Sequence, residues 1–265
     1  MDPIAQFKAQ QKITWSSFAI LESLTASVAP RLVRFAGITA GTQVLDVGCG
    51  TGVVALTAAR LGARVEGVDL TPELVAHAKE NATLMQLEVT FQEGDAEALP
   101  FGDARFDFVV SQFGHMFAPR PEVAIKEMLR VLKPGGTIAF STWPPELFVG
   151  RSFALMGKYA PPPPPGVSPP AQWGDPAIVR ERLGSAVRDL MFTRDEMVFQ
   201  TLSPQHQRLF MEKNFGPATK LLQGLDASDP QKATALRRDM EELAAQYFEN
   251  NAIRQGFLIS RAIKA

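Results

Sequence analysis

The chain has 265 residues, of which 46% are hydrophobic and 21% are charged. This composition excludes a globally disordered protein, and the length suits one core domain with a sizeable insertion. The formal net charge is −1 and no run of lysine or arginine stands out, which argues against nucleic acid as the main partner.

Cysteine usage and the N-terminal residues favour the cytoplasm. Cys49 is the single cysteine, so an internal disulfide is impossible and a reducing compartment is favoured. The first residues lack the charged and apolar blocks of a signal peptide. No apolar stretch approaches the roughly 20 residues that cross a bilayer. We therefore expect a cytoplasmic protein with no membrane partner.

Residues 4–36 have a helical apolar pattern. Their large apolar side chains recur at steps of three and four residues, which is the spacing of one helix face. Pro30 interrupts the pattern, and Gly37 ends a second short helix. The sequence therefore predicts N-terminal helices within residues 1–40.

Short apolar runs alternate with helical segments over residues 41–143. Strands are predicted over residues 43–47, 64–69, 88–92, 106–111 and 137–142. Thr71 and Pro72 fit the cap and the first position of a helix, and Pro121 opens another one. Because such alternation implies a parallel sheet with right-handed crossovers, this region is predicted to be an α/β core.

Prolines dominate the next segment, residues 144–186. Five consecutive prolines at 161–165 favour an extended polyproline II conformation. We interpret them as a stiff surface connection, and the alternative is a rigid wall beside a pocket. Asp175 then starts a short helix that Gly184 ends.

The C-terminal segment, residues 187–265, contains two predicted strands with helices between them. The strands are predicted over residues 187–200 and 252–262. The first of them is expected to bend near Arg194. Ser203 and Asp229 each precede a proline and fit helix caps, so residues 203–250 are predicted to be a helical insertion.

A glycine-rich turn follows the first strand of the core. Gly48, Gly50 and Gly52 let the backbone bend sharply and let a ligand approach closely, and the next helix offers free N–H groups at its start. A dinucleotide loop would need a glycine where the chain has Val53. Asp46 is awkward beside a pyrophosphate but attracts a ligand that carries an ammonium and a sulfonium. The pattern therefore favours S-adenosylmethionine (SAM) over NAD.

Two further aspartates follow strands at suitable spacing. Asp69 ends the second strand nineteen residues after Gly50, close to the ~20 expected for a carboxylate that binds ribose hydroxyls. Asp95 follows the third strand and can accept a hydrogen bond from an adenine amino group, while the next backbone N–H donates to the ring. The alternatives are an ordinary surface aspartate at Asp69 and a plain turn at Asp95.

Together these residues resemble the class I SAM-dependent methyltransferases, and most of all the group that includes the ubiquinone and menaquinone biosynthesis methyltransferases. The resemblance extends from Lys8 to Trp143 and rests on residues 44–52, 65–69, 93–101, 106–111 and 129–136. It implies a Rossmann-like α/β fold with a seven-stranded, mostly parallel sheet, helices on both faces and an antiparallel last strand. We expect the N-terminal helices, the Pro-rich segment and the helical insertion to form a lid.

The resemblance also assigns a set of residues to SAM and its product, S-adenosylhomocysteine (SAH). The methionine part would lie beside Asp46, Gly48, Cys49, Gly50 and Gly52, the ribose beside Asp69 and Leu70, the adenine beside Asp95 and Ala96, and the transferred methyl beside Ser111 and Gln112. Trp15 either closes over the methionine end or only packs helices.

Methyl transfer needs alignment and a dry site, and it needs a base only if the acceptor must lose a proton near the transition state. His115, which follows the fourth strand, is the best candidate for a catalytic base, and the alternative is a rim histidine without a chemical role. His206 in the lid is a second candidate, and His77 is expected to face solvent. Cys49 has no base near it in the sequence and fits a small packing residue.

The acceptor is predicted to be a small molecule, and no metal is predicted because Cys/His clusters and paired carboxylates are absent. Aromatic residues gather in the expected lid, namely Trp143, Phe148, Phe153, Tyr159, Trp173, Phe210, Phe215, Tyr247 and Phe248. They form either the lid core or a pocket for an apolar or aromatic acceptor. Two other functions stay open, an NAD-dependent oxidoreductase and a non-catalytic SAM-binding module, and the sequence sets no oligomeric state.

Overall fold

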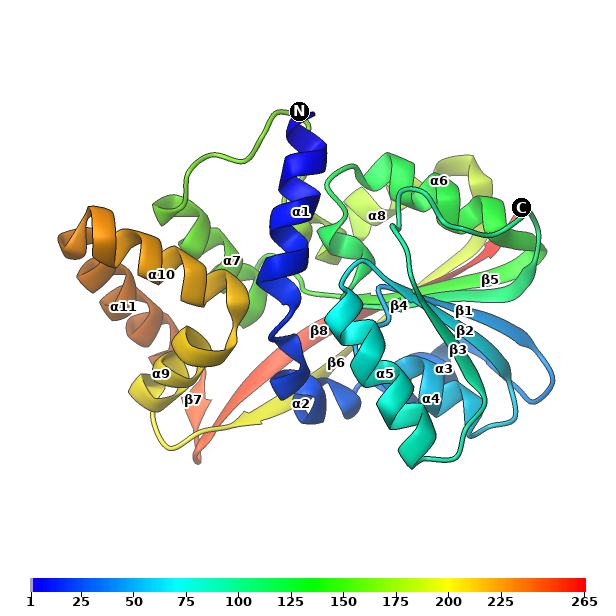
Figure 1. Ribbon diagram of the computed structural model, residues 1–265, viewed down its shortest axis with the longest axis horizontal. Helices are drawn as coiled ribbons and strands as arrows, with labels where there is room; N and C mark the ends of the chain where they lie inside the picture. The colour runs from blue at the N-terminus through cyan, green and yellow to red at the C-terminus, as the bar shows by residue number, and fades with distance from the viewer. Residues whose placement is uncertain (1) are drawn as a thin grey trace.

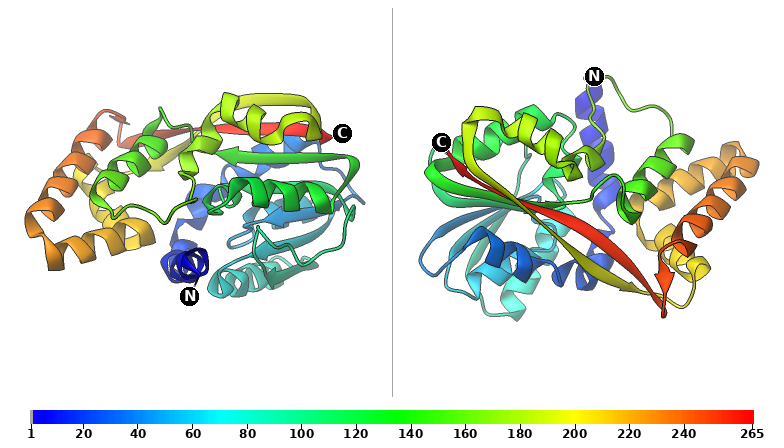
Figure 2. Two further views of the ribbon diagram at one scale, coloured as in Figure 1. Left: turned by 90° about the horizontal axis from the view of Figure 1, so that it is seen from above. Right: turned by 180° about the vertical axis from the view of Figure 1, so that it is seen from behind.

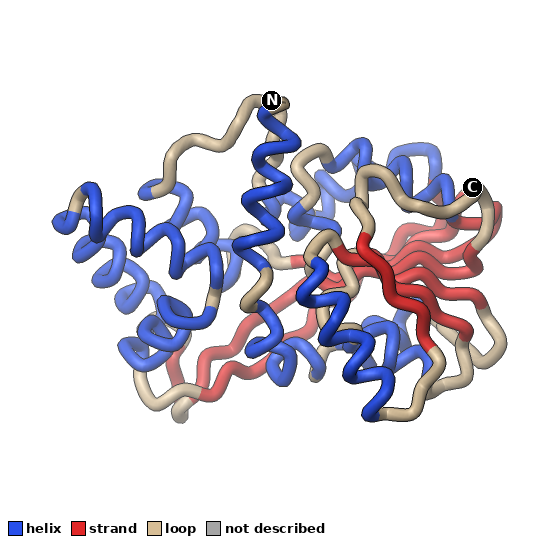
Figure 3. The backbone as a smooth tube through the Cα atoms, in the orientation of Figure 1, coloured by secondary structure: helices blue, strands red, loops and turns tan. Residues whose placement is uncertain are grey.

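One β-sheet organises the chain, which the computed structural model describes over residues 2–265 (Figure 1, Figure 3). Its strands lie in the order β3-β2-β1-β4-β5-β8-β6. They are β1 (Gln43–Val47), β2 (Arg64–Asp69), β3 (Val89–Glu93), β4 (Phe106–Gln112), β5 (Leu132–Thr142), β6 (Val187–Gln200) and β8 (Ala252–Lys264). Strands β1 to β5 pair in parallel, whereas β8 is antiparallel to both β5 and β6. The predicted seven-stranded, mostly parallel sheet is confirmed, and a short strand, β7 (Phe248–Glu249), additionally pairs with β8.

Helices cover both faces of this sheet (Figure 1, Figure 2). One face carries α3 (Ala29–Ala36), α4 (Val53–Ala59) and α5 (Pro72–Leu84), and the other carries α6 (Pro121–Val131) and α8 (Pro176–Leu183). Both faces are therefore shielded from water, as is usual for parallel strands joined by helical crossovers.

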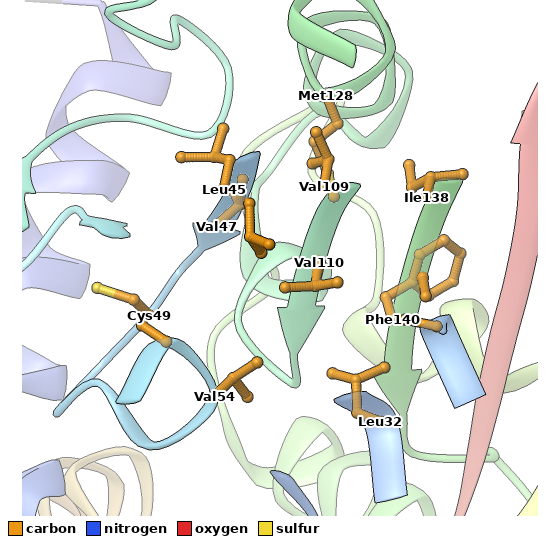
Figure 4. Packing of buried hydrophobic residues seen from close by; sticks show 14 of the residues in the cluster. Leu32, Leu45, Val47, Cys49, Val54, Val109, Val110, Met128, Ile138 and Phe140 are labelled. Carbon is orange, nitrogen blue, oxygen red and sulfur yellow. The ribbon is translucent and has the colours of Figure 1, made fainter. Parts of the chain in front are cut away.

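The parallel strands consist of continuous apolar runs because both of their faces are buried. Val44, Leu45 and Val47 of β1 have no exposed surface, and Val109 and Val110 of β4 pack beside them (Figure 4). Fully burying one such side chain stabilises the fold by about 1.5–3 kcal/mol. These runs carry enough local information for the sequence to predict β1 to β4 to within a residue or two, and the end of β5 as well.

The antiparallel pair β6–β8 extends beyond the rest of the sheet as a long two-stranded ribbon (Figure 2). Its register shifts between Arg188 and Met191, and Asp189 adopts a φ of 53° within that shift. The bend expected near Arg194 is therefore wrong in its position, because pairing there is regular and the irregularity lies at the start of the strand. A bulge of this kind bends a strand and increases its twist.

Four helices form a layer around the far end of this ribbon, here called the cap (Figure 1). They are α7 (Phe148–Tyr159), α9 (Pro204–Asn214), α10 (Gly216–Ser228) and α11 (Pro230–Ala245). Leu222, Leu225 and Leu236 form a small apolar core between α10 and α11. Three of the four cap helices come from the insertion predicted over residues 203–250.

The sequence pattern does not predict helix α7, because prolines flank it and glycines interrupt it. Gly150 permits a close backbone contact, since a Cβ at this position would lie 2.1 Å from the backbone oxygen of Pro144. Phe148 and Met156 are buried and anchor the helix. Tertiary packing therefore stabilises a segment whose local helix propensity is weak.

Helix α1 (Pro3–Trp15) stands between the cap and the sheet and buries none of its residues (Figure 1). It leads into η1 (Phe18–Leu21) and α2 (Glu22–Ala26). Asp2 caps α1 by accepting a hydrogen bond from the N–H of Ile4 at 3.1 Å. The other end of α1 touches the start of α10, where a Cβ on Gly216 would lie 1.8 Å from the backbone oxygen of Thr14.

The five prolines at 161–165 belong to neither helix nor strand and are mostly exposed, as a surface connection requires. The remaining short helices are η2 (His115–Phe117), η3 (Pro170–Gly174) and η4 (Gly184–Ala186). Within η3, Trp173 is fully buried against the sheet and fixes the end of the Pro-rich segment. Among residues 2–265, no helix has both the length and the apolar character needed to cross a bilayer.

We expect Gly216→Ala to destabilise the protein by about 1–3 kcal/mol, because the added methyl group would push α10 away from α1. Gly224→Ala in the same helix is the matched control, since its Cβ would meet no atom within 4 Å and a helical glycine-to-alanine change stabilises by about 0.5–1 kcal/mol. Urea unfolding gives both free energies of unfolding. Equal effects of the two substitutions would contradict a tight α1–α10 contact.

Candidate cofactor and acceptor site

A cavity of about 220 Å³ lies where the carboxyl ends of the parallel strands face the cap and α1. The loops that follow β1, β2, β3 and β4 form one wall, and α1 and the cap helices form the other. Open α/β sheets bind ligands at this edge, beside the point where the strand order reverses. Here that point lies between β1 and β4.

The three glycines of the turn after β1 have different roles. All have positive φ angles, 66° at Gly48, 54° at Gly50 and 87° at Gly52. A Cβ added at Gly48 would lie 2.8 Å from the backbone of Gly114, and one added at Gly52 would lie 2.8 Å from the Phe91 ring. A Cβ added at Gly50 would meet nothing within 4 Å. The first two glycines line the cavity and Gly52 does not. Gly52, which the sequence assigns to SAM, instead lies outside the cavity lining and permits close packing against Phe91 of β3.

Asp46 is the buried acid at the end of β1, and it lines the cavity with only 1% of its surface exposed. Its Oδ2 accepts a hydrogen bond from the N–H of Ala55 at 3.1 Å, whereas its Oδ1 has no partner within residues 2–265. Burial, reinforced by the charge of Asp69 and opposed by the Ala55 hydrogen bond, raises the pKa of Asp46 to about 7. A buried carboxylate oxygen without a partner fits the ammonium group of SAM.

Asp69 ends β2 and ties the glycine turn to it. Its Oδ2 accepts from the N–H of Gly50 at 2.8 Å and its Oδ1 from the N–H of Thr71 at 2.9 Å. Burial raises the pKa of Asp69. Asp69 and Leu70 both line the cavity. Because each carboxylate oxygen has two lone pairs, Asp69 retains the capacity to accept ribose hydroxyls.

Asp95 lines the cavity with Ala96, and it contacts a partner that sequence reasoning missed. Its Oδ2 lies 2.6 Å from the Nζ of Lys8 on α1, which also lies 2.6 Å from a carboxylate oxygen of Glu97. Arg120 pairs with Glu97 from the other side. These ion pairs hold α1 over the loop that follows β3. Helix periodicity gives no information on which distant carboxylate a lysine will meet, so the sequence carries no signal for this contact.

The two residues at the end of β4 differ in position. Ser111 is fully buried and does not line the cavity. Its hydroxyl donates to the backbone oxygen of Val47 at 2.6 Å and accepts from the N–H of His115 at 3.0 Å. Ser111, which the sequence places beside the transferred methyl, is therefore buried behind the cavity wall and joins β1 to the loop after β4. Gln112 does line the cavity, with Nε2 donating to the backbone oxygen of Thr25 at 2.9 Å and Oε1 without a partner among the described residues.

None of the three histidines, all within the described residues, lines the cavity. His115 is 1% exposed, its ring centre lies 4.5 Å from that of Phe140 and 4.8 Å from that of Trp173, and burial lowers its pKa to about 3. His206 contacts a neighbouring threonine and His77 is half exposed. The hypothesis that His115 is a catalytic base is therefore corrected, because packing turns its ring away from the site.

Trp15 and Cys49 both line the cavity. The Trp15 ring lies 4.5 Å from Phe117 and 5.7 Å from Phe215, so this tryptophan packs helices and also borders the site. Burial, together with the charges of Asp69 and Asp46, raises the pKa of the Cys49 thiol well above its ordinary value. A protonated thiol is a poor nucleophile, which supports the packing role of Cys49.

The cap side of the cavity is apolar, and the expected lid aromatics divide between two roles. Four of the nine line the cavity, namely Trp143, Phe148, Phe153 and Phe215. The other five pack inside the cap or against the sheet. Within residues 2–265, no group of three or more histidine, cysteine, aspartate or glutamate side chains is arranged to hold a metal ion.

Comparison with known proteins decides the family. A family model described as "Methyltransferase domain" matches residues 45–140. Rv1405c, an uncharacterized protein of Mycobacterium tuberculosis strain H37Rv, is 36% identical over 97% of this chain and 94% of its own length. The demethylmenaquinone methyltransferase of Staphylococcus aureus strain Newman is 40% identical over 138 residues, 50% of this chain and 56% of that protein. The chain belongs to the class I SAM-dependent methyltransferases.

Solved structures share the fold of this methyltransferase. The YcgJ protein of Bacillus subtilis has a TM-score of 0.60 at 21% identity, covering 90% of this chain and 98% of that one. Haemonchus contortus phosphoethanolamine N-methyltransferase 2, solved with SAM, has a TM-score of 0.56 at 20% identity, covering 90% and 52%. The family model and the demethylmenaquinone methyltransferase relative identify SAM as the cofactor of this methyltransferase. They favour this activity over an NAD-dependent oxidoreductase and over a non-catalytic SAM-binding module.

The buried acid predicts a pH-dependent affinity for SAH. With the pKa of Asp46 raised to about 7, half of the free protein lacks the negative charge that attracts the ligand ammonium at that pH. We expect calorimetry to show SAH binding about tenfold tighter at pH 8 than at pH 6, because binding requires the ionised carboxylate. Asp46→Asn is the control, and its SAH affinity should be weak and should change little with pH. An equally steep dependence in that variant would assign the titration to another group, such as Asp69.

The same shift has the opposite effect on the stability of the ligand-free protein. The pKa of Asp46 is about 7 in the folded chain and 3.8 for an ordinary aspartate, so folding takes up a proton at any pH between these two pKa values. Stability from this group is fully present below pH ~4 and is lost as the pH rises through ~7. We expect the melting temperature of the wild type relative to that of Asp46→Asn to fall over this range, as measured by scanning calorimetry without ligand. A difference independent of pH would contradict the raised pKa.

Proposed function

We propose that this methyltransferase transfers the methyl group of SAM to a small, uncharged and largely apolar molecule bound beneath the cap. The observation that carries the proposal is the distribution of charge around the cavity. Its four charged lining residues come from α1, from the ends of β1 and β2 and from the loop after β3, and they are Lys8, Asp46, Asp69 and Asp95. The cap contributes no charged side chain to the lining, so an ionised acceptor would lose its hydration without gaining a partner.

The residue types that line the cavity support the same conclusion. The apolar part of the cavity beneath the cap is here called the chamber. Aromatic rings of Trp15, Phe117 and Phe215 border it. Four methionines add flexible apolar surface, namely Met156, Met197, Met211 and Met240. Methionine side chains adapt to ligands of irregular shape. The position of the cavity between α1, the cap helices and the sheet and the net charge of −1 support a small molecule over a nucleic acid.

In this proposal each of the three aspartates binds a different part of the cofactor. Asp46 would hold the ammonium with its free Oδ1, Asp69 the ribose hydroxyls, and Asp95 the adenine amino group. When bound, SAM supplies an activated methyl carbon whose bond to sulfur breaks as the acceptor's lone pair forms the new bond. The glycine turn gives the cofactor close access to the backbone, and the cap keeps water away from the reacting atoms.

No histidine among residues 2–265 lines the cavity, and this limits how the protein can assist the methyl transfer. No imidazole of the described residues is placed to remove a proton from the acceptor. Alignment of donor and acceptor alone can lower a barrier by several kcal/mol. In this proposal the chain positions and desolvates the reactants, and the acceptor has an atom that attacks without help from an imidazole.

Labelled methyl transfer tests the proposal directly. The protein is incubated with SAM carrying a labelled methyl group and with metabolite extracts separated into neutral apolar, cationic, anionic and macromolecular fractions. We expect labelled product only in the neutral apolar fraction, followed by its identification by mass. Label confined to charged metabolites, protein or RNA would overturn the proposed acceptor class.

A charge placed in the chamber should abolish acceptor use and leave the cofactor bound. We expect Met211→Lys to lower kcat/KM for the identified acceptor by at least about tenfold, because an unpaired buried charge is costly, while SAH affinity stays within about twofold. Leu209→Lys on the same helix is the control, since Leu209 is exposed and does not line the cavity. Equal losses in the two variants would contradict an apolar acceptor site at α9.

A further inference from the structure

Two glutamine side chains in the apolar part of the chamber have no partner. Gln207 on α9 and Gln255 on β8 are each only 4% exposed, and both line the cavity. The backbone N–H of Gln207 donates to Ser203 in the first turn of α9, but neither side-chain amide makes a hydrogen bond to any of residues 2–265. Their amide atoms keep accessible surface toward the cavity. A ligand that displaces water there must hydrogen-bond these amides or leave them unpaired, at a cost of about 1–3 kcal/mol each.

The surroundings of both amides are apolar. Gln255 lies directly opposite Met197 in the β6–β8 register, so these two side chains share one face of the ribbon. Met211 follows Gln207 by one helical turn on α9, and both residues line the cavity. The two amides are therefore polar points in a wall of methionine and aromatic side chains.

The other polar groups on this side of the cavity are already used. Ser152 donates to the backbone oxygen of Phe148 at 2.8 Å, and Gln11 donates to the backbone oxygen of Phe117 at 3.0 Å. Gln112 is fixed at the end of β4 by its bond to Thr25. Gln207 and Gln255 are thus the cavity-lining amides whose donors and acceptors are both free for a ligand.

We propose that Gln207 and Gln255 determine acceptor specificity by binding an uncharged oxygen function, a hydroxyl or a carbonyl, on the apolar acceptor. This inference rests on the proposed function and narrows its substrate class. An amide carries two donors and an acceptor but no charge, so it satisfies a neutral oxygen and offers no counter-ion to a carboxylate or an ammonium. A site built to hydrogen-bond an oxygen rejects the analogue without it, because its own polar groups are then left unpaired.

Binding of three matched probes to the SAH-loaded protein tests the inference without knowledge of the natural acceptor. The probes are naphthalene, 2-naphthol and 2-naphthoate, and equilibrium dialysis gives their dissociation constants. We expect the wild type to bind 2-naphthol about tenfold more tightly than naphthalene, and 2-naphthoate more weakly than 2-naphthol. The doubly substituted protein, Gln207→Met with Gln255→Met, should lose the preference for 2-naphthol and bind naphthalene at least as tightly as the wild type.

Matched controls separate a local effect from damage to the fold. Gln205→Met on α9 and Gln200→Met on β6 make the same chemical change at exposed positions and should keep the wild-type preference. Each variant must also bind SAH within about twofold of the wild type, which shows that the cofactor half is intact.

The outcomes distinguish this inference from the proposed function. If the wild type binds naphthalene and 2-naphthol equally, or if the double variant keeps the preference, the glutamine inference is overturned and the apolar acceptor site stands. If the wild type binds 2-naphthoate most tightly, or binds neither neutral probe, the uncharged acceptor of the proposed function fails and the glutamine inference fails with it.

Discussion

Two buried carboxylates at the carboxyl end of the sheet set the energetics of this methyltransferase. Asp46 and Asp69 lie on neighbouring parallel strands, where burial raises the pKa of both, and the charge of Asp69 raises the pKa of Asp46 further. Backbone N–H groups of the glycine turn and of α4 satisfy part of this charge. One oxygen of Asp46 remains without a partner among the described residues. The apo site is therefore electrostatically incomplete, and a cationic cofactor stabilises the part of the fold that binds it.

Ion pairs hold helix α1 over this site more than apolar packing does. Helix α1 buries no residue, yet it reaches the loop after β3 through Lys8 and meets Phe117 and Phe215 through Trp15. Lys8 holds the same carboxylate, Asp95, that faces the cavity. Lys8 therefore ties α1 to a carboxylate of the cavity wall, and added salt weakens the exposed part of this contact.

The sequence predicts those features that local spacing encodes. The apolar runs of β1 to β5, the glycine turn and the carboxylates at strand ends are local, and the structure brings Asp46, Asp69 and Asp95 to one cavity. Features that depend on packing between distant segments could not be predicted. Helix α7 is stabilised by its fit against Pro144–Pro145, and Ser111 and His115 turn inward because loops that converge from distant segments fill the space around them. Position after a strand indicates nearness to a site, but it does not indicate the direction of a side chain.

The β6–β8 ribbon links the cap to the sheet in a way that bears on how acceptor range can change. Gln200 and Ala252, where the two long strands stop, are direct partners across the ladder, and α9, α10 and α11 are all inserted between them. Both ends of this insertion therefore leave from one point at the tip of a hairpin. The insertion can therefore differ in length or sequence without interrupting the pairing of β8 with β5, which lies at the other end of the strand.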